Sequence, residues 1–294
     1  MNQQKKILIL RATYGPSDEK NLAPLLRSRQ FQLKYYKDLI IYLEPQPGTT
    51  KITIDGVPLE SYDLVYIRTW KTRHFLSRII GRYLQYKKIP FIDSETVSSS
   101  YGDKLVQYMG FHINRFPFPK TLFIPRESIL KNQPLILNYF SLPFVMKSDF
   151  ENKGKDNYLI SSVGEINKIL GKSTDDKNFI FQEFIPNNFD YRFCVFGYKT
   201  AIAYKRIRLQ GSKTHLNNVS QGARVVKVPL APIKKLCILA EKAARLSRIE
   251  VCGVDIVIDK NSQKPYIFEV NNIPGFSQRS AQNKLKKYLL SLAK

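Results

Sequence analysis

Residues 253–271, GVDIVIDKNSQKPYIFEVN, contain two apolar stretches that are each interrupted by polar side chains. Asp255 lies inside the first stretch, and Glu269 and Asn271 lie two positions apart in the second. Because side chains alternate between the faces of a strand, Glu269 and Asn271 point to the same face. Buried carboxylates need a compensating charge, and oxygen ligands of this kind suit Mg²⁺. The pattern therefore predicts two neighbouring strands carrying a divalent metal site, completed by phosphate oxygens.

A simpler explanation of the same residues involves no metal. Asp255 would cap a turn after Gly253, and Glu269 would pair with a surface lysine. Both explanations remain open on this stretch alone.

The composition indicates a globular and strongly basic protein. The chain has 294 residues, 43% of them hydrophobic, which predicts one large or two modest domains with a substantial core. Lys and Arg number 47 and Asp and Glu number 24, so the formal net charge is +23. Such a charge attracts nucleic acid, nucleotides, acidic peptides or anionic lipid. A lysine-rich solvated surface explains it equally well, because no block of consecutive like charges stands out.

Cysteine usage and hydropathy lead us to expect a cytoplasmic protein. Cys194, Cys237 and Cys252 are far apart and form no CxxC motif, so reduced core thiols are expected. The apolar run at 7–10 ends at Arg11, whereas a signal peptide needs about 7–15 apolar residues. No uninterrupted apolar run approaches the roughly 20 residues of a membrane span, so no membrane association is expected.

Apolar periodicity divides the chain into three blocks. Residues 1–95 alternate strands with a helix and predict an open α/β layer, with strands at 7–10 and 64–67, a hairpin over 51–59 and a helix over 75–86. Residues 96–186 predict a small α+β unit, with strands at 144–147, 158–160 and 179–185 and helices at 104–109 and 163–170. Residues 187–294 predict a hairpin at 191–196 and 200–207, strands at 254–258 and 266–270, and helices at 233–249 and 281–292.

Several lysines of the middle block stand where the phosphates of a nucleotide could be held. Lys104 begins a helix, and Lys147 ends the apolar strand PFVMK. Lys153 and Lys155 flank Gly154 in a polar loop. A lysine at a strand end beside a glycine-containing loop is a common phosphate-binding arrangement. Taken singly, each lysine in so basic a chain is more often an exposed surface residue.

Two further strand patterns carry polar residues with a potential role. The segment QEFIP at 182–186 ends a strand with Glu183 and Phe184, where backbone groups could read an adenine edge, although many edge strands end this way. Asp190 directly precedes the predicted hairpin, and Arg192 and Arg206 lie in it. An arginine that faces a site can anchor a carboxylate or a developing acyl phosphate, and the alternative is an exposed strand arginine.

Taken in their order along the chain, these segments resemble the ATP-grasp superfamily, in its RimK-like and glutathione-synthetase-like branch. The resemblance covers roughly residues 95–280, and residues 1–95 resemble the pre-grasp domain of that family only in outline. It is carried by DKL at 103–105, FVMK at 144–147, QEFI at 182–185, DYRFCVFG at 190–197, NVSQGA at 218–223, GVDIV at 253–257 and EVNNIPGF at 269–276. The last two segments, at their spacing, are the most specific.

The resemblance implies an ATP-grasp fold of α/β and α+β class. Residues 1–95 would form a Rossmann-like pre-grasp domain, and residues 96–186 and 187–294 would form two α+β lobes that enclose ATP. It also implies two bound Mg²⁺ ions, with Mn²⁺ as an alternative. The implied roles are phosphate contacts for Lys104 and Lys147, an adenine hinge at Glu183 and Phe184, ribose binding by Asp190, a place near the phosphates for Asn218, metal binding by Asp255, Glu269 and Asn271, and catalytic stabilisation of the acyl phosphate by Arg206.

The sequence departs from the family pattern at two places. The lid segment ENKGKDN, at 151–157, has Gly154 as its only glycine, where relatives often have more. Gln221 stands where RimK-type ligases usually have arginine, and Ala223 replaces a second glycine. These positions lie near the acceptor, so the identity of the substrates is not carried over.

The expected activity is ATP-dependent, ADP-forming ligation of a carboxylate to an amine through an acyl phosphate. The acceptor would be an amino acid, a peptide or a protein, and an acidic peptide would suit the basic surface. On the same scaffold, an ester- or lactam-forming peptide ligase or an ATP-dependent kinase is the alternative. A nucleic-acid or ribosome-binding protein is the alternative of another class, although no RNA-recognition aromatic motif or helix-turn-helix pattern is present.

Overall fold

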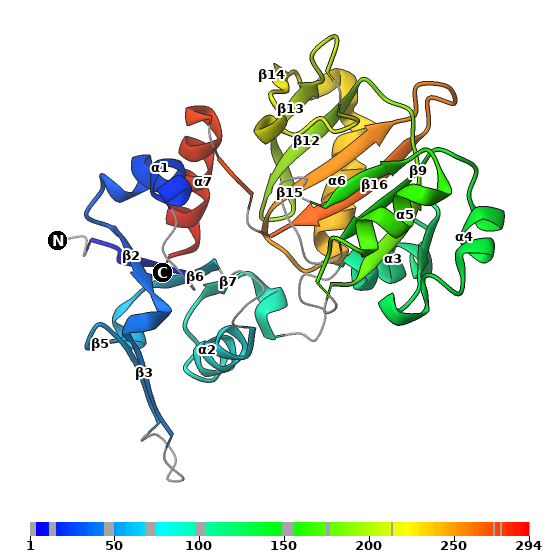
Figure 1. The fold of residues 1–294 in the computed structure, drawn as a ribbon. Coiled ribbons are helices and arrows are strands. Elements are labelled where there is room, and N and C mark those ends of the chain that lie inside the picture. The colour runs from blue at the N-terminus through cyan, green and yellow to red at the C-terminus, as the bar shows by residue number, and fades with distance from the viewer. Residues whose placement is uncertain are drawn as a thin grey trace.

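The computed structural model describes residues 4–11, 16–43, 50–68, 74–97, 104–148, 156–174, 177–212, 214–272, 274–276 and 278–293. Within these ranges the strands form four sheets, and Figure 1 shows an N-terminal layer beside two lobes that face each other. The predicted α/β and α+β class is confirmed.

The N-terminal layer is built around the apolar run at residues 7–10. This run forms β1 (Ile7–Arg11), which lies inside a parallel sheet of order β2-β1-β6-β7 with β2 (Phe31–Tyr35), β6 (Leu64–Arg68) and β7 (Phe91–Ile92). Ile7 and Ile9 join one core, and Leu8 and Leu10 join another, so both faces of β1 are covered. Helix α1 (Pro16–Leu26) contributes to the first core and α2 (His74–Tyr86) to the second.

A small antiparallel ribbon extends from this layer (Figure 1). It contains β3 (Leu39–Tyr42), β4 (Lys51–Ile54) and β5 (Val57–Pro58) in the order β3-β4-β5. Asp55 and Gly56 have φ angles of 53° and 73°, the left-handed region that a two-residue hairpin turn requires. The hairpin predicted at Asp55-Gly56 is therefore confirmed.

The first of the two facing lobes carries an antiparallel sheet of order β10-β9-β11-β8. Its strands are β8 (Thr121–Phe123), β9 (Phe144–Ser148), β10 (Asn157–Ile160) and β11 (Phe179–Glu183), and its helices are α4 (Gln133–Tyr139) and α5 (Val163–Leu170). Fully buried Phe144, Met146, Phe179 and Phe181 join one core with residues of both helices. Residues 151–155 of the predicted lid, which include Gly154 and its flanking Lys153 and Lys155, lie outside the described residues.

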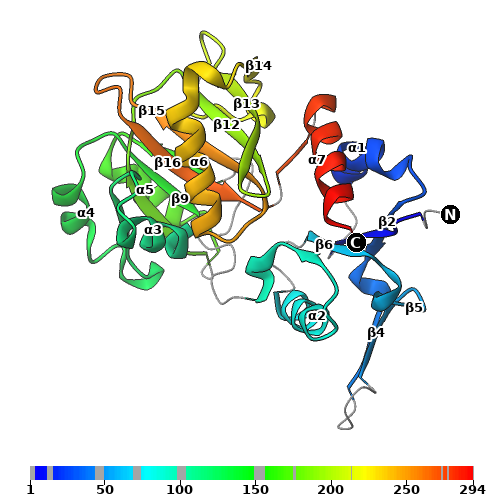
Figure 2. The same ribbon diagram turned by 180° about the vertical axis from the view of Figure 1, so that it is seen from behind.

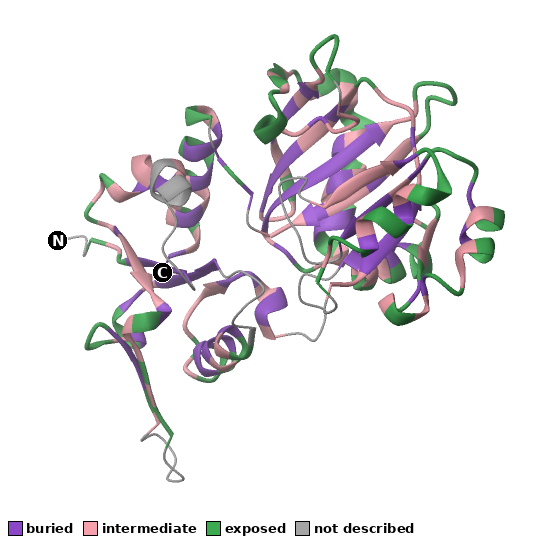
Figure 3. Cartoon of the chain, viewed as in Figure 1, coloured by how far each residue is buried: buried purple, intermediate pink, exposed green. Residues whose placement is uncertain are grey.

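The second lobe carries a five-stranded antiparallel sheet of order β14-β13-β12-β15-β16. The strands are β12 (Phe189–Phe196), β13 (Lys199–Ile207), β14 (Arg224–Val228), β15 (Val251–Ile258) and β16 (Pro265–Asn271). Helix α6 (Lys234–Leu246) covers one face of this sheet through Ala240, Ala243 and Ala244 (Figure 2). Buried residues run along β12 and β15, at the centre of the sheet (Figure 3).

Helix α3 (Lys104–Ile113) fixes the position of β16. The side-chain amide of Gln107 donates to the carbonyl of Val270 at 2.9 Å and accepts from the N–H of Val270 at 3.0 Å. The Tyr108 hydroxyl donates to the carbonyl of Phe268 at 2.8 Å. Three backbone groups of β16 are thereby satisfied by side chains of α3, which holds the strand carrying Glu269 in register.

The last helix, α7 (Arg279–Leu292), connects the second lobe to the N-terminal layer. It lies beside α1 in both ribbon views (Figures 1 and 2). Leu285 and Leu289 of α7 are buried in the same core as Leu22 and Leu25 of α1. The layer and the lobe consequently share one hydrophobic core.

Polar contacts add to this connection. Asp93 Oδ1 accepts from the N–H of Val251 at 2.8 Å, and Arg68 Nη2 donates to the carbonyl of Pro274 at 2.9 Å. The Arg68 guanidinium also lies 5.7 Å from the centre of the Phe276 ring. The segment after β16 is thus held against the N-terminal layer. None of the helices within the described ranges has the length and apolar composition that a membrane span requires.

Candidate functional site

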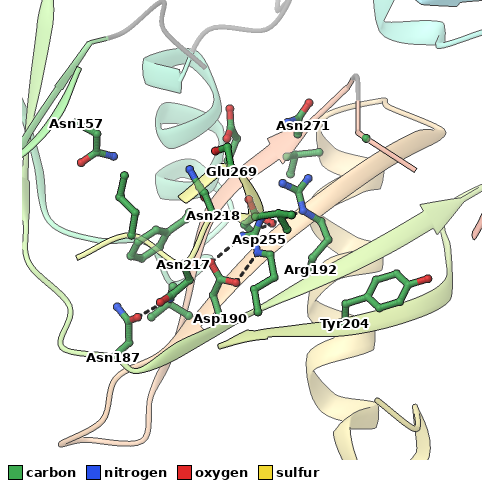
Figure 4. A pocket seen from close by; sticks show the side chains of 18 of the residues that line it. Asn157, Asn187, Asp190, Arg192, Tyr204, Asn217, Asn218, Asp255, Glu269 and Asn271 are labelled. Carbon is green, nitrogen blue, oxygen red and sulfur yellow. Dashed lines mark hydrogen bonds and ion pairs between the residues drawn. The ribbon is translucent and has the colours of Figure 1, made fainter. Parts of the chain in front are cut away.

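A pocket of about 520 Å³ lies between the sheets of the two lobes. Its walls come from β9 and β11 on one side and from β12, β13, β15 and β16 on the other, with Asn21 of α1 at one end. A volume in this range accommodates a nucleotide together with part of a second substrate. Figure 4 shows polar side chains from several strands converging on this space. All ten residues of the predicted site line it: Lys104, Lys147, Glu183, Phe184, Asp190, Arg206, Asn218, Asp255, Glu269 and Asn271.

One row of residues crosses four strands of the second lobe on the pocket face. Tyr204 of β13 is paired with Arg192 of β12, Arg192 with Asp255 of β15, and Asp255 with Glu269 of β16. Directly paired residues of antiparallel strands point to the same face with Cβ atoms about 5 Å apart. The register therefore places the two carboxylates side by side, and Asn271, two positions after Glu269, lies on the same face.

Two arginines neutralise Asp255 of this row and Asp190, which lies two positions before Arg192 in β12. Arg206 binds both oxygens of Asp190, with Nε to Oδ1 at 2.6 Å and Nη2 to Oδ2 at 2.7 Å. Oδ1 of Asp255 lies 2.7 Å from Arg192 Nε and 3.1 Å from Arg206 Nη2. The cationic compensation that the sequence predicts for Asp255 is provided here by guanidinium groups. The alternative of an exposed Arg206 is wrong, since this side chain is 6% exposed.

Burial sets the protonation of this cluster. Desolvation raises the pKa of Asp190 to about 6, against the opposing effect of the Arg206 guanidinium, so the carboxylate is ionised at neutral pH. For Arg206, desolvation is outweighed by the carboxylates of Asp255 and Asp190, and its pKa is raised. The cluster is thus a fixed and charge-balanced array of two carboxylates and two guanidinium groups that faces the pocket.

Arg192 is a pocket residue that the sequence analysis did not include in the site. Its place depends on Gly253: a Cβ atom at Gly253 would stand 2.2 Å from Arg192 Nη1 and 3.0 Å from its Cδ. A sequence signal was present, because Asp190 and Arg192 stand two positions apart in a strand, as Glu269 and Asn271 do. The same alternation that identified Glu269 and Asn271 could have identified Arg192.

The opposite wall carries the predicted phosphate lysines. Lys147, at the end of β9, is 8% exposed, and its Nζ donates to Gln182 Oε1 at 2.7 Å and to the Tyr108 hydroxyl at 3.0 Å. Lys104, the first residue of α3, is also 8% exposed and lines the pocket. A nearly buried ammonium group that lines the pocket is well placed to receive an anionic ligand.

The predicted adenine hinge lies at the end of β11. The Glu183 carboxylate accepts from the backbone N–H of Lys120 at 2.6 Å, which leaves the apolar Phe184 and Ile185 to line the pocket. The Phe184 ring meets His215 edge to face, with ring centres 6.3 Å apart. His215 Nε2 lies 2.9 Å from Asn157 Oδ1, and burial, with a smaller effect of Arg208, lowers the pKa of His215 to about 4.

Two asparagines close the pocket near this hinge. Asn217, which the sequence analysis missed, is 5% exposed and its amide donates to Asn187 Oδ1 at 2.7 Å. The carbonyl of Asn218 accepts from the N–H groups of Gln221 and Ala223, at 2.9 and 3.3 Å. These backbone bonds hold residues 218–223 in a tight turn beside the pocket. This turn contains Gln221 and Ala223, the two residues that depart from the family pattern. No local sequence pattern marks His215 or Asn217, because their contacts join segments far apart in the chain.

The residues of the second lobe have the chemistry of a magnesium site. Within the described residues no group of three or more His, Cys, Asp or Glu side chains is placed to hold a metal. Asp255, Glu269 and Asn271 instead offer two carboxylates and one amide oxygen on one face of paired strands. Hard oxygen ligands that leave positions open for phosphate oxygens fit Mg²⁺.

Comparison with solved structures gives the fold a context. PsnB, an ATP-grasp ligase complexed with minimal precursor, Mg and ADP, is 12% identical and superposes with a TM-score of 0.68 over 98% of this chain and 97% of PsnB. VanG D-Ala:D-Ser ligase from Enterococcus faecalis is 13% identical, with a TM-score of 0.73 over 99% and 100% of the two chains. A RimK domain protein from Sphaerobacter thermophilus DSM 20745 is 16% identical, with a TM-score of 0.63 over 97% and 99%.

Sequence comparison adds the family. No curated protein matches the chain in sequence. The profile of the RimK-like ATP-grasp domain matches residues 111–288, more than half of the chain, and this range includes nine of the ten predicted site residues, all except Lys104. Since the matched range, the fold and the pocket agree, the chain belongs to the RimK-like ATP-grasp family and is an ATP-grasp ligase.

Proposed function

We propose that the protein joins a carboxylate to an amine in an ATP- and Mg²⁺-dependent reaction that passes through an acyl phosphate and releases ADP. The observation that carries this proposal is the pairing of Arg192, Asp255 and Glu269 across three strands, opposite Lys147 on the facing lobe. The pocket thus combines anion-binding groups on both walls with a set of oxygen ligands between them. Phosphoryl transfer to a carboxylate requires this combination.

The chain's own residues would divide the work between the two walls. Lys147 and Lys104 would hold the phosphates of ATP, and Phe184 and Ile185 would cover the adenine. Asp190 would meet the ribose through a remaining lone pair of the carboxylate oxygens that Arg206 also binds. Asp255, Glu269 and Asn271 would together hold two Mg²⁺ ions. Mn²⁺ would be able to take the place of Mg²⁺. Bound Mg²⁺ would neutralise charge on the phosphates during transfer.

The two arginines would act on the carboxylate substrate. Arg192 and Arg206 reach the same oxygen of Asp255, so their remaining N–H groups lie together at the centre of the pocket. A guanidinium pair in this position would orient the carboxylate and stabilise the negative charge of the acyl phosphate. Arg206, which is fixed by two bonds to Asp190, is proposed as the catalytic residue.

The reaction has two balanced steps. A carboxylate oxygen of the substrate attacks the γ-phosphorus of ATP, the new bond joins that oxygen to phosphorus, and ADP leaves with the bridging oxygen. The amine nitrogen then attacks the acyl carbon, the carbon–oxygen bond to phosphate breaks, and the nitrogen loses a proton. Neither step needs a protein nucleophile.

The experiment follows the oxygen atoms. Candidate amino acids and acidic peptides are first tested for stimulation of ADP release, and the active carboxylate is then labelled with ¹⁸O. The proposal expects ADP and phosphate as products, with one labelled oxygen in the phosphate. AMP and pyrophosphate, or label that stays wholly in the organic product, would refute it. Transfer of phosphate to a product that retains it would identify a kinase, and an oxygen acceptor would identify an ester-forming ligase.

A further inference from the structure

The positive charge of the protein is concentrated in one stretch of the second lobe. Residues 191–240 contain ten Lys or Arg residues and no Asp or Glu. This stretch includes most of β12, all of β13 and β14, and the first half of α6. Arg192 and Arg206 of this stretch are paired with aspartates, whereas Arg224 and Lys227 of β14 are exposed. Exposed positive charge next to a pocket steers ligands of the opposite sign toward it.

Strand β14 forms the edge of the five-stranded sheet within this basic stretch. Its one strand partner among the described residues is β13, so its second row of backbone N–H and C=O groups has no strand beside it. Val225 is paired with Arg206, and Lys227 with Tyr204, which places both on the pocket face of the sheet. Val225 itself lines the pocket. The edge therefore runs from the open surface to the reaction centre.

Exposed aliphatic side chains surround the same edge. Val226 of β14 is 39% exposed, Leu209 is 55% exposed and Val219 is 54% exposed. A Cβ at Gly222 would touch Leu209 at 3.9 Å, so Leu209 lies over the turn that leads into β14. Charged residues are found on many edge strands simply because they prevent unwanted pairing with another chain. Exposed aliphatic side chains on an edge strand instead promote pairing. Basic and aliphatic groups together fit a partner that has both acidic and apolar side chains.

We infer that β14 docks an extended acidic peptide, which adds to the sheet as a further strand and presents a side chain to the pocket next to Val225. Main-chain hydrogen bonds to the edge would provide affinity, and Arg224 and Lys227, both exposed, would select acidic residues. A nucleic acid fits less well, because it has no row of amides to pair with a strand edge. The assignment of this peptide as the substrate rests on the proposed ligase function, whereas the docking itself does not.

The test is a binding measurement with the full chain in the absence of nucleotide. The probe is a fluorescein-labelled peptide of Glu-Glu-Val-Val repeats, about ten residues long, the span of a long strand. These repeats place Glu on both faces, as Arg224 and Lys227 require because they point to opposite faces of the sheet. In an extended peptide, alternate backbone N–H groups point to opposite sides. Two further versions of the peptide are therefore N-methylated on alternate residues, and each version blocks the hydrogen bonds of one side. Strand addition expects one N-methylated version to bind at least about tenfold more weakly and the other within about twofold of the parent, because only one edge faces β14. Equal effects of the two versions would overturn the proposal.

A pair of matched variants locates the binding. Arg224→Gln with Lys227→Gln is expected to weaken binding of the parent peptide at least about tenfold. Lys234→Gln with Lys235→Gln removes the same charge from the exposed first turn of α6 and is expected to change the affinity less than about twofold. Equal losses in both double variants would mean attraction to the net charge alone and would overturn the assignment to β14.

Amide hydrogen exchange provides an independent readout on the unaltered protein. Bound peptide is expected to slow exchange at residues 224–228 and to leave the edge strand β16, on the other side of the sheet, unchanged. The same measurement is made with a uridine oligomer of similar length. If the oligomer binds more tightly than the peptide and slows exchange at the same residues, the partner is a nucleic acid and the peptide proposal is wrong. Since none of these measurements involves turnover, a failed docking test leaves the ligase chemistry standing, and a failed ¹⁸O test leaves the docking standing.

Discussion

The guanidinium group of Arg192 occupies the space that a side chain at Gly253 would need, with Nη1 2.2 Å from the position of a Cβ. Glycine inside a strand weakens it, and here the compensating gain is the close approach of Arg192 to Asp255 at 2.7 Å. The pair thus explains why a strand otherwise made of apolar residues and one aspartate contains a glycine.

Gly253→Ala is expected to displace Arg192 and to reduce kcat/KM for the carboxylate substrate by at least about tenfold, a loss of about 1.4 kcal/mol in transition-state binding. Affinity for ATP should change little, because the nucleotide wall is untouched. Steady-state kinetics with each substrate varied in turn measure both. Gly164→Ala is the control, since a Cβ there meets nothing within 4 Å; a Gly253 variant as active as this control would contradict the role of Arg192.

Glu269→Gln is expected to abolish ATP turnover while the protein stays folded. The substitution keeps the shape of the side chain and removes the negative charge that the metal requires. Turnover is followed by ADP release over a range of Mg²⁺ concentrations, and folding by circular dichroism. Asp259→Asn makes the same chemical change in the exposed turn between β15 and β16 and should be silent. Activity of Glu269→Gln within a few-fold of the wild type would show that this carboxylate does not hold the metal.

Lys147→Ala is expected to weaken ATP binding by tens-fold or more, because a charged hydrogen bond contributes about 1.5–3 kcal/mol. Calorimetric titration with a non-hydrolysable ATP analogue measures the affinity. Lys147→Met separates charge from packing, since it keeps the aliphatic stem beside Tyr108. Lys168→Ala, on the exposed face of α5, controls for net charge. Unchanged affinity in both Lys147 variants would remove this residue from the phosphate site.

His215 is expected to make stability depend on pH. Its pKa is lowered by burial to about 4, whereas in the unfolded chain it is about 6.5. Between these values the unfolded chain binds a proton that the folded protein does not, so stability falls as the pH falls from about 6.5 toward 4. The loss is on the order of 3 kcal/mol at the acid end. Denaturant unfolding at several pH values should show a smaller decrease for His215→Gln, and parallel decreases would contradict this origin.

Strand periodicity was sufficient to identify much of the site. The alternation around Val270 placed Glu269 and Asn271 on one face, and both line the pocket. Arg206 and Tyr204 stand two positions apart in β13, so the same alternation puts them on one face, and both line the pocket too. These predictions depended only on neighbours in the chain, for which the period of two holds in any strand.

Other features depend on contacts that no local pattern contains. The ion pair of Arg192 with Asp255 requires β12 and β15 to pair in one register, although β13, β14 and α6 separate them in sequence. Asn217 and His215 obtain their partners from β10 and from the segment before β12. The amphipathic pattern of 281–292 predicted an apolar face but not that α1 would cover it. Pairing partners of this kind are set by the global packing of the chain.

The shared core of α1 and α7 has a consequence for how the protein forms on the ribosome. Leu22 and Leu25 emerge well before the side chains that cover them, those of Leu285 and Leu289, which lie far further along the chain. Until then one face of β1 and α1 stays open to water, whereas the first of the facing lobes, whose core lies within residues 124–181, can close much earlier. The nascent N-terminal layer is therefore the part of the chain that most needs protection from aggregation during translation.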